Sequence, residues 1–215
     1  MDNRNVDPAV RAASRRPPDE KIVARVLAEL SEHGLLLETD RQLPNVCALV
    51  TGETVRGSWW AHPRSHDIFR VNCALADHMD VLVTKLISGK VTFVHRSLWP
   101  AVIAAGQLRT PEELEPLSPA ARKLLLEVDN SAVESDRENS KAISELEKRG
   151  LVYGEQFHGA TGAHGKRIES WLHWSKRRGF VSPPLNAMEG RDKLEAMVAH
   201  LNRKFNARAR LPWQA

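Results

Sequence analysis

Cysteine is scarce in this chain of 215 residues. Cys47 and Cys73 are the two that occur, and they form no Cys-x-x-Cys pattern. A thiolate zinc site or a disulfide framework is therefore not expected. Both cysteines lie among apolar residues, so we expect buried free thiols in a cytoplasmic protein.

Long apolar runs are missing as well. No run approaches the roughly 20 residues that a membrane-spanning helix needs. Met1 to Pro18 contains four arginines but no apolar segment, unlike a secretory signal. The sequence predicts no membrane partner, and it predicts a loose basic tail over residues 1–18.

Common catalytic signatures do not occur either. The chain has no Walker loop, no GxGxxG, no GxSxG and no HExxH pattern. No motif therefore favours nucleotide hydrolysis, dinucleotide redox chemistry or serine hydrolase activity. We expect no cofactor.

Charge is present but uneven, although the formal net charge is only +4. Residues 111–139 contain eight acidic and three basic side chains, whereas residues 166–178 contain five basic side chains and one acidic. Residues 191–215 contain six basic side chains and two acidic. Clustered positive charge attracts a phosphate backbone. A basic protein can also carry such charge without binding nucleic acid.

The first half reads as three helices followed by a hairpin. Apolar spacing predicts helices over residues 19–33, 43–50 and 64–76. Strands are expected over residues 80–87 and 90–95, with Ser88-Gly89 as the turn between them. This order is the order of a winged helix. Ser97 is then expected to cap a helix from Leu98 to Ala105.

The second half repeats the theme. Helices are expected from Ser118 to Glu127 and from Asp136 to Arg149. A strand from Leu151 to Phe157, a glycine-rich tip and a strand from Lys166 to Trp174 should follow. Arg191 to Phe205 reads as a final amphipathic helix.

The run from Ser144 to Tyr153, Ser-Glu-Leu-Glu-Lys-Arg-Gly-Leu-Val-Tyr, resembles the end of a recognition helix entering its first wing strand. Residues 112–178 thus resemble the winged helix-turn-helix superfamily, which implies DNA binding. Glu145 and Glu147 depart from the pattern, because they place negative charge on the helix that would enter the groove. That departure argues against direct base reading, and some winged helices dock proteins instead.

These patterns predict an α+β protein made of tandem winged-helix-like units, mostly helical with short β-hairpins. We expect a flexible tail over residues 1–18 and an N-terminal lobe over residues 19–108. A C-terminal winged helix should occupy residues 109–182, and a final helix with a basic tail residues 183–215. That final helix is a candidate homodimer interface.

Trp59-Trp60 is the first candidate site. On a strand the two side chains would point to opposite faces, which leaves one free to stack on a base. The alternative is that one packs in the core and the other covers a neighbouring helix. The nearby His62, Arg64 and Asp67 are candidates for acid–base work or phosphate contact. Pro63 spoils a two-histidine metal site here, so no metal is expected.

The hairpins carry the remaining candidates. Lys90 could act as a Schiff-base nucleophile if it lies in a dry, cationic pocket, and a solvated phosphate contact is the simpler interpretation. The other candidates for nucleic-acid contact on the two hairpins are Lys85, Thr92, His95, Arg96, His164, Lys166 and Arg167.

A tandem arrangement with a polar, Trp-containing cleft is similar to the bacterial winged-helix alkylpurine DNA glycosylases. Their catalytic signature does not occur here, so no residue is carried over. The first hypothesis is a cytoplasmic, nucleoid-associated DNA-binding protein of DNA repair, acting as a glycosylase or abasic-site lyase. The alternatives are a non-enzymatic winged-helix transcriptional regulator and a protein-interaction module.

Overall fold

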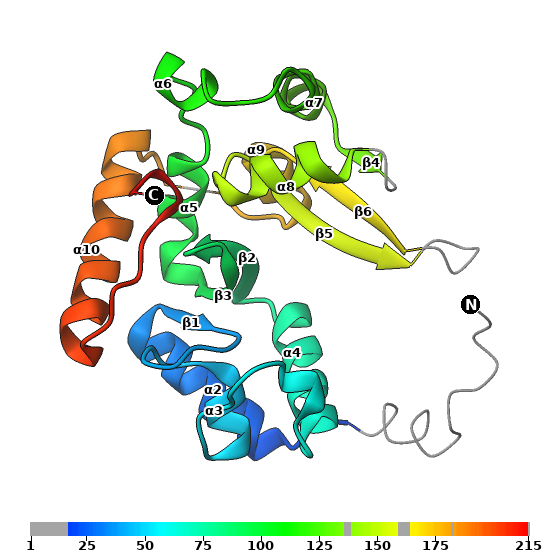
Figure 1. Ribbon diagram of the computed structural model, residues 1–215. Coiled ribbons are helices and arrows are strands. Elements are labelled where there is room, and N and C mark those ends of the chain that lie inside the picture. The colour runs from blue at the N-terminus through cyan, green and yellow to red at the C-terminus, as the bar shows by residue number, and fades with distance from the viewer. Residues whose placement is uncertain (1–16, 136–138, 159–163, 182, 215) are drawn as a thin grey trace.

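The structure is a computed structural model, and it describes residues 17–135, 139–158, 164–181 and 183–214. Helices and two small antiparallel sheets alternate along the chain, which confirms the α+β class (Figure 1). The elements are α2 Glu20–His33, β1 Leu35–Leu37, α3 Val46–Thr51, η1 Trp59–Ala61, α4 Ser65–Asp77, β2 Val81–Ile87, β3 Lys90–His95, η2 Arg96–Leu98, α5 Trp99–Ala105, α6 Pro111–Leu114, α7 Pro119–Asn130, β4 Val133–Ser135, α8 Ser140–Lys148, β5 Tyr153–His158, β6 His164–Glu169, α9 Trp171–Arg177, α10 Ala187–Phe205 and η3 Pro212–Gln214.

The first unit comprises α2 to β3. The side chain of Asp19 caps α2, and Gly34 ends it in the left-handed conformation that glycine favours. Its sheet has the order β1-β3-β2. Ser88 and Gly89 both have positive φ, which gives β2 and β3 the tight hairpin turn that the sequence predicts.

A core that belongs to this unit alone lies between the helices and the sheet. It includes Val26 and Leu30 of α2, Ile68 and Leu75 of α4, and Phe93 of β3, all at most 1% exposed. The apolar stripe of each helix packs into this core, and this packing fixes α4 against α2 and the sheet.

The second unit comprises α7 to β6. Ser118 caps α7 and Pro119 occupies its first turn, as predicted. The sheet has the order β4-β6-β5. Leu124 of α7, Leu146 of α8 and Ile168 of β6 lie in its own core.

Two expectations for the second unit were wrong, and one strand was missed. The strand predicted over Lys166 to Trp174 ends at Glu169, and Ser170 caps α9 instead. The helix predicted from Asp136 begins at Ser140, and Asp136 lies outside the described residues. The short strand β4 was not expected.

A shared core joins the two units. Trp99 of α5, Trp171 and Trp174 of α9, and Leu194 of α10 are all at most 2% exposed in it. The helix α10 begins earlier than predicted, because Asn186 and Glu189 form a reciprocal capping box. The domain boundaries predicted near residues 108 and 182 stay predictions. Residues on both sides of each boundary contribute to this shared core.

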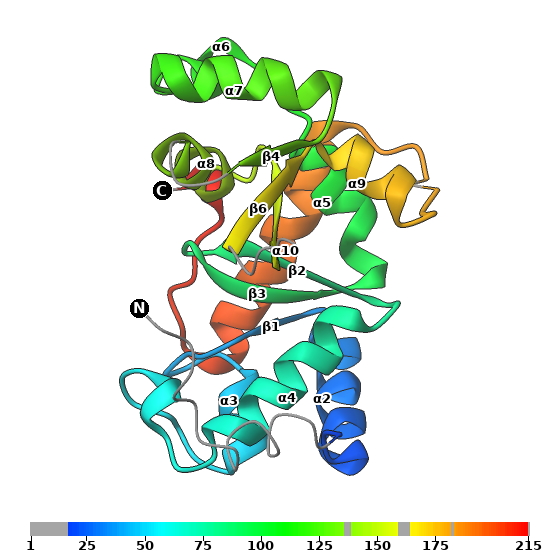
Figure 2. The same ribbon diagram turned by 90° about the vertical axis from the view of Figure 1, so that its right-hand side faces the viewer.

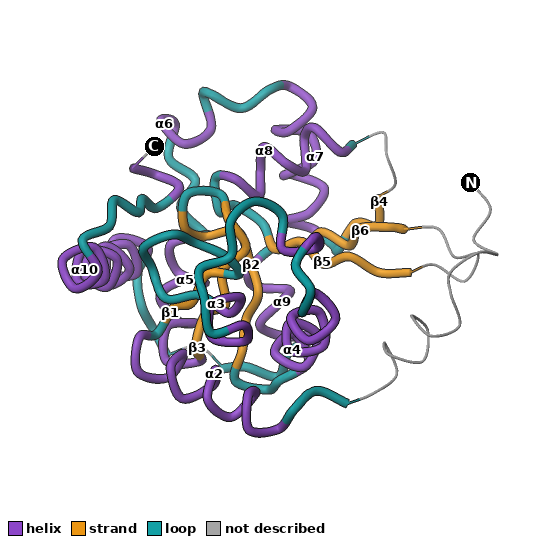
Figure 3. The backbone as a smooth tube through the Cα atoms, turned by 60° about the horizontal axis from the view of Figure 1, so that its bottom comes forward, coloured by secondary structure: helices purple, strands orange, loops and turns teal. Residues whose placement is uncertain are grey.

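The arrangement places α10 at one side of the molecule and the β5–β6 hairpin at the other (Figure 3). After α10 the chain runs extended to η3. Within the part of the chain that the structure describes, no helix is long and apolar enough to cross a bilayer.

Candidate nucleic-acid interface

Trp59 and Trp60 lie in the short 3-10 turn η1 rather than on a strand. Their rings stack on each other with centroids 3.9 Å apart, so the expectation of opposite faces was wrong. Trp59 is 7% exposed and belongs to the core, whereas Trp60 is 62% exposed and lies beside Phe69. The turn therefore leaves one aromatic ring available for stacking.

His62, Arg64 and Asp67 form a local network at the start of α4. The ring of His62 contacts Glu53 through Nε2 and accepts the backbone N–H of Arg64 at Nδ1. Asp67 lies between Arg64 and Arg70. Burial raises the pKa of Asp67, but the hydrogen bonds from the two arginines outweigh burial and leave it lowered. The network holds the start of α4 in place. Most of its charged side chains form ion pairs with one another.

Lys90 does not lie in a dry, cationic pocket. Its ammonium group is half-exposed and forms an ion pair with Asp40 at 2.7 Å. The surroundings expected of a Schiff-base lysine are therefore not found around Lys90. Thr92 is fully buried, and its hydroxyl donates to the carbonyl of Lys90 and accepts from the N–H of Ile87. Contact of Thr92 with nucleic acid was thus a wrong expectation, because no part of its side chain reaches the surface.

His95 is the last residue of β3 and Arg96 is the first of η2, so both lie at the far end of β3 from the Ser88-Gly89 turn. His95 caps η2, where its Nδ1 accepts the N–H of Ser97. Arg96 contacts Asp80 and lies over the rings of Trp99 and Phe180. Ser97 was expected to cap a helix directly, but η2 intervenes before α5.

Lys85 and Lys166, which are distant in the sequence, converge on one carboxylate. Lys166 of β6 lies 2.6 Å from Oε2 of Glu147, and Lys85 of β2 lies 3.5 Å from the same atom. Glu147 is 8% exposed. The three charges join the sheet of the first unit to α8 and the sheet of the second.

Gly154 of β5 makes room for this cluster. A Cβ atom at that position would overlap the carboxylate of Glu147. A residue without a side chain is therefore required if Glu147 is to reach both lysines, and the requirement comes from space rather than from backbone conformation.

A cleft of about 490 Å³ opens next to this cluster, at the junction of the two units. Its walls come from α4, β2, α8, β5, β6 and α9, and they include Lys85, Tyr153 and Arg178. Arg177, also on the wall, binds Glu155 and the almost fully buried Glu169. Acidic and basic groups thus balance each other across the cleft.

The two glutamates of α8 both have partners within the protein, but only Glu147 is buried. Glu145 accepts hydrogen bonds from the N–H and the hydroxyl of Ser118, and these bonds lower its pKa. Glu147 faces the two lysines of the junction. The outward side carries Lys141 and Lys148, both exposed, with the half-buried Ser144 and Glu145 between them. These positions share one face of the helix because they are three and four residues apart.

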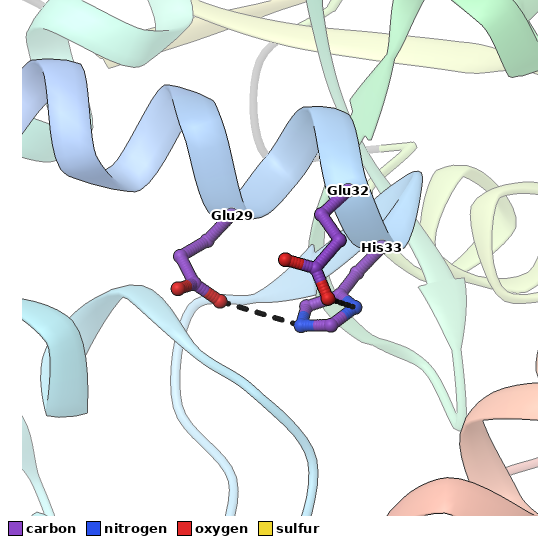
Figure 4. Close-up of side chains that lie close together, drawn as sticks. All are labelled: Glu29, Glu32 and His33. Atoms are coloured by element: carbon purple, nitrogen blue, oxygen red, sulfur yellow. Dashed lines mark ion pairs between the residues drawn. The ribbon is translucent and has the colours of Figure 1, made fainter.

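One group of three possible metal ligands occurs among the described residues, at the end of α2 (Figure 4). Glu29 contacts Nε2 of His33, whereas Glu32 lies near Nδ1, at the other side of the ring. Lys204 of α10 forms an ion pair with Glu32 at 2.9 Å. Because the carboxylates approach different nitrogens and one already has a cation, the geometry favours a structural cluster over a metal site.

The structure therefore brings together few of the predicted site residues. Trp59, Trp60, His62, Arg64 and Asp67 form one group, and Lys85 and Lys166 another, while Lys90 and the His95–Arg96 pair lie apart. Arg167 is half-buried on β6, with its Nε unpartnered among the described residues. His164 begins β6, and its side chain lies outside the described part.

Of the cleft residues, the sequence indicated Lys85 and Lys166 but missed Tyr153, Arg177 and Arg178, and it placed Glu147 on the helix face that would enter the groove. The helical period offered a signal, since Glu147 follows the apolar Ile143 and Leu146 on the same face. Comparison with known proteins adds no relative: no family model, no curated protein and no solved structure matches this chain.

Proposed function

We propose that this protein binds duplex DNA through its second unit, with α8 as the helix that faces the groove. The proposal is supported by the order of elements from α2 to β3 and the sheet order β1-β3-β2, which resemble those of a winged helix. The second unit has the corresponding sheet order β4-β6-β5, with α8 directly before the β5–β6 hairpin. In such a unit the helix before the hairpin enters the major groove.

The observation that carries the proposal is that both glutamates of α8 have partners within the protein. The sequence alone makes α8 look acidic, which argues against a place beside phosphates. Glu147 is buried against two lysines and the half-buried Glu145 is bonded to Ser118, so the exposed side chains of α8 include Lys141 and Lys148. Exposed lysines suit contact with phosphates and base edges.

The test is a salt titration of duplex affinity for Lys141→Gln/Lys148→Gln. Loss of two phosphate contacts should lower the slope of log K against log salt by about 1.8. A matched control is Lys21→Gln/Lys176→Gln, because both lysines are exposed and lie on α2 and α9, on the opposite side in Figure 2. Equal slopes for wild type and the α8 variant would contradict the proposal.

Action on a damaged nucleotide is a second candidate, favoured by the cleft at the junction. Lys85 stands on the wall of that cleft and is more than one-third exposed. An abasic-site lyase would form an imine between a lysine and the opened sugar, which borohydride reduces to a stable adduct. We expect an adduct on abasic duplex that Lys85→Met abolishes and Lys90→Met retains. No adduct with the wild-type protein leaves DNA binding as the function.

A further inference from the structure

The chain after α10 lies across the tip of the β2–β3 hairpin. We call residues 206–214 the strap. The N–H of Ser88 donates to the carbonyl of Arg210 at 2.8 Å, and the N–H of Arg210 donates to the hydroxyl of Ser88. The two-residue turn of the first unit is therefore covered by the strap and tied to it.

Side chains hold the strap along its length. Asn202 of α10 both donates to the carbonyl of Ala209 and accepts its N–H. Gln42 donates to the carbonyl of Asn206, and Trp213 donates to Glu195. Leu211 is buried in the shared core. The strap thus has a fixed backbone, although it is not paired as a strand of either sheet.

This fixed backbone presents arginines at alternate positions. Ala207, Ala209 and Leu211 pack against the protein, whereas Arg208 and Arg210 are exposed. No ion pair or side-chain hydrogen bond of either guanidinium is found within the described residues. In an extended chain such side chains emerge on the same side about 7 Å apart.

The strap continues the surface of α8. Gly150, just after α8, lies so close to Pro212 that an added Cβ would be 3.5 Å from the Pro212 ring. Figures 1 and 2 both show the η3 end of the strap near the C-terminal end of α8, while the rest of the strap runs alongside α10. A single straight partner could therefore touch both.

We propose that Arg208 and Arg210 form a second phosphate-contacting element, which binds the backbone of the duplex that α8 faces. Guanidinium groups bind phosphate oxygens in a bidentate manner, and a fixed backbone reduces the entropy lost on binding. The strap supplies the cations that the short, covered Ser88-Gly89 turn does not offer. This inference rests on the proposed function, since it adds a contact to the same complex.

The experiment compares three variants in salt titrations on one duplex: Arg208→Gln/Arg210→Gln, Arg208→Lys/Arg210→Lys and Lys141→Gln/Lys148→Gln. We expect the first to lower the salt slope by about 1.8 and to weaken binding about tenfold or more at moderate salt. The lysine variant should keep most of the slope, because it keeps the charge. Unchanged melting curves would verify the fold, as both side chains are exposed.

The outcomes separate the two claims. If the α8 variant loses slope while the strap variant matches wild type, the inference on the strap is overturned and the proposed function stands. If wild type does not bind any duplex, both are overturned.

Discussion

Lys166 lies 2.6 Å from the carboxylate of Glu147, and this ion pair couples β6 to α8 inside the protein. Replacing Glu147 by Gln leaves the ammonium group of Lys166 half-buried without a counter-charge. We expect a loss of about 2 kcal/mol in the free energy of unfolding. Chemical denaturation measures it, with Lys85→Met as the control, which should cost less than about 1 kcal/mol because that pair is longer and more exposed. Equal losses would contradict this, because they would assign the stabilisation to the Lys85–Glu147 pair rather than to Lys166.

Gly154→Ala should destabilise the protein by pushing the Glu147 carboxylate off its lysines. We expect a cost of about 2 kcal/mol in the wild-type background. In the Glu147→Ala background the closest obstacle is gone and the Cε atom of Lys166, 3.0 Å away, is left, so the same change should cost about 1 kcal/mol or less. A double-mutant cycle by denaturation tests this, and additive costs would locate the strain elsewhere.

Trp59 and Trp60 should differ sharply although they are neighbours. Trp59→Ala opens a cavity in the first core, and we expect a loss of about 3–5 kcal/mol. Trp60→Ala removes an exposed ring and one stacking contact, so about 1 kcal/mol is expected. If Trp60 stacks on a base, its variant will also weaken binding to single-stranded DNA at temperatures where the variant is still fully folded. Unchanged affinity would restrict Trp60 to packing.

Tyr153 is the single tyrosine of the chain, so tyrosinate absorbance reports on it alone. Burial, reinforced by the charge of Glu155, raises the pKa of Tyr153 to about 12. Because the folded pKa lies above the ordinary value of 10, this group contributes stability fully below pH 10 and loses it as the pH rises towards 12. We expect Glu155→Gln to lower the pKa of Tyr153. A titration midpoint near 10 in the folded protein would contradict this.

The two thiols should react at very different rates. Burial, with a smaller contribution from Glu38, raises the pKa of Cys47 to about 12, and its side chain is fully buried. Cys73 is exposed on α4, although burial and Asp77 raise its pKa too. We expect one equivalent of thiol to label in the folded protein and the second only in denaturant. Saturating duplex should leave the rate at Cys73 unchanged, because the proposed DNA face is α8; strong protection would move that face to α4.

Local signals in the sequence predicted most helices and the first hairpin. Asp19, Gly34, Ser118 and Pro119 act within a turn of their own positions, so their meaning does not depend on the rest of the fold. The alternation from Lys166 to Trp174 misled for a related reason. The spacing of Trp171 and Trp174 is compatible with a strand and with one face of a helix. Both side chains are buried in the shared core, which requires the helix.

The candidate site was less predictable because its contacts are not local. Lys85 and Lys166 were both expected to face phosphates, but nothing near either in the sequence indicates that Glu147 lies between them. The same gap affected the charge of α8, since the partner of the Glu145 carboxylate is Ser118 at the start of another helix. The sequence predicted that one ring of the Trp59-Trp60 pair is free, whereas it did not predict the cleft.

The shared core has a consequence for the order of folding. Leu35 and Leu211 belong to the same cluster, whereas the core of the first unit is complete within residues 26–93. Contacts between residues so far apart require a large loop to close, which slows their formation. We therefore expect the first unit to collapse early and the docking of α10 with its strap to be the late step that locks the two units together.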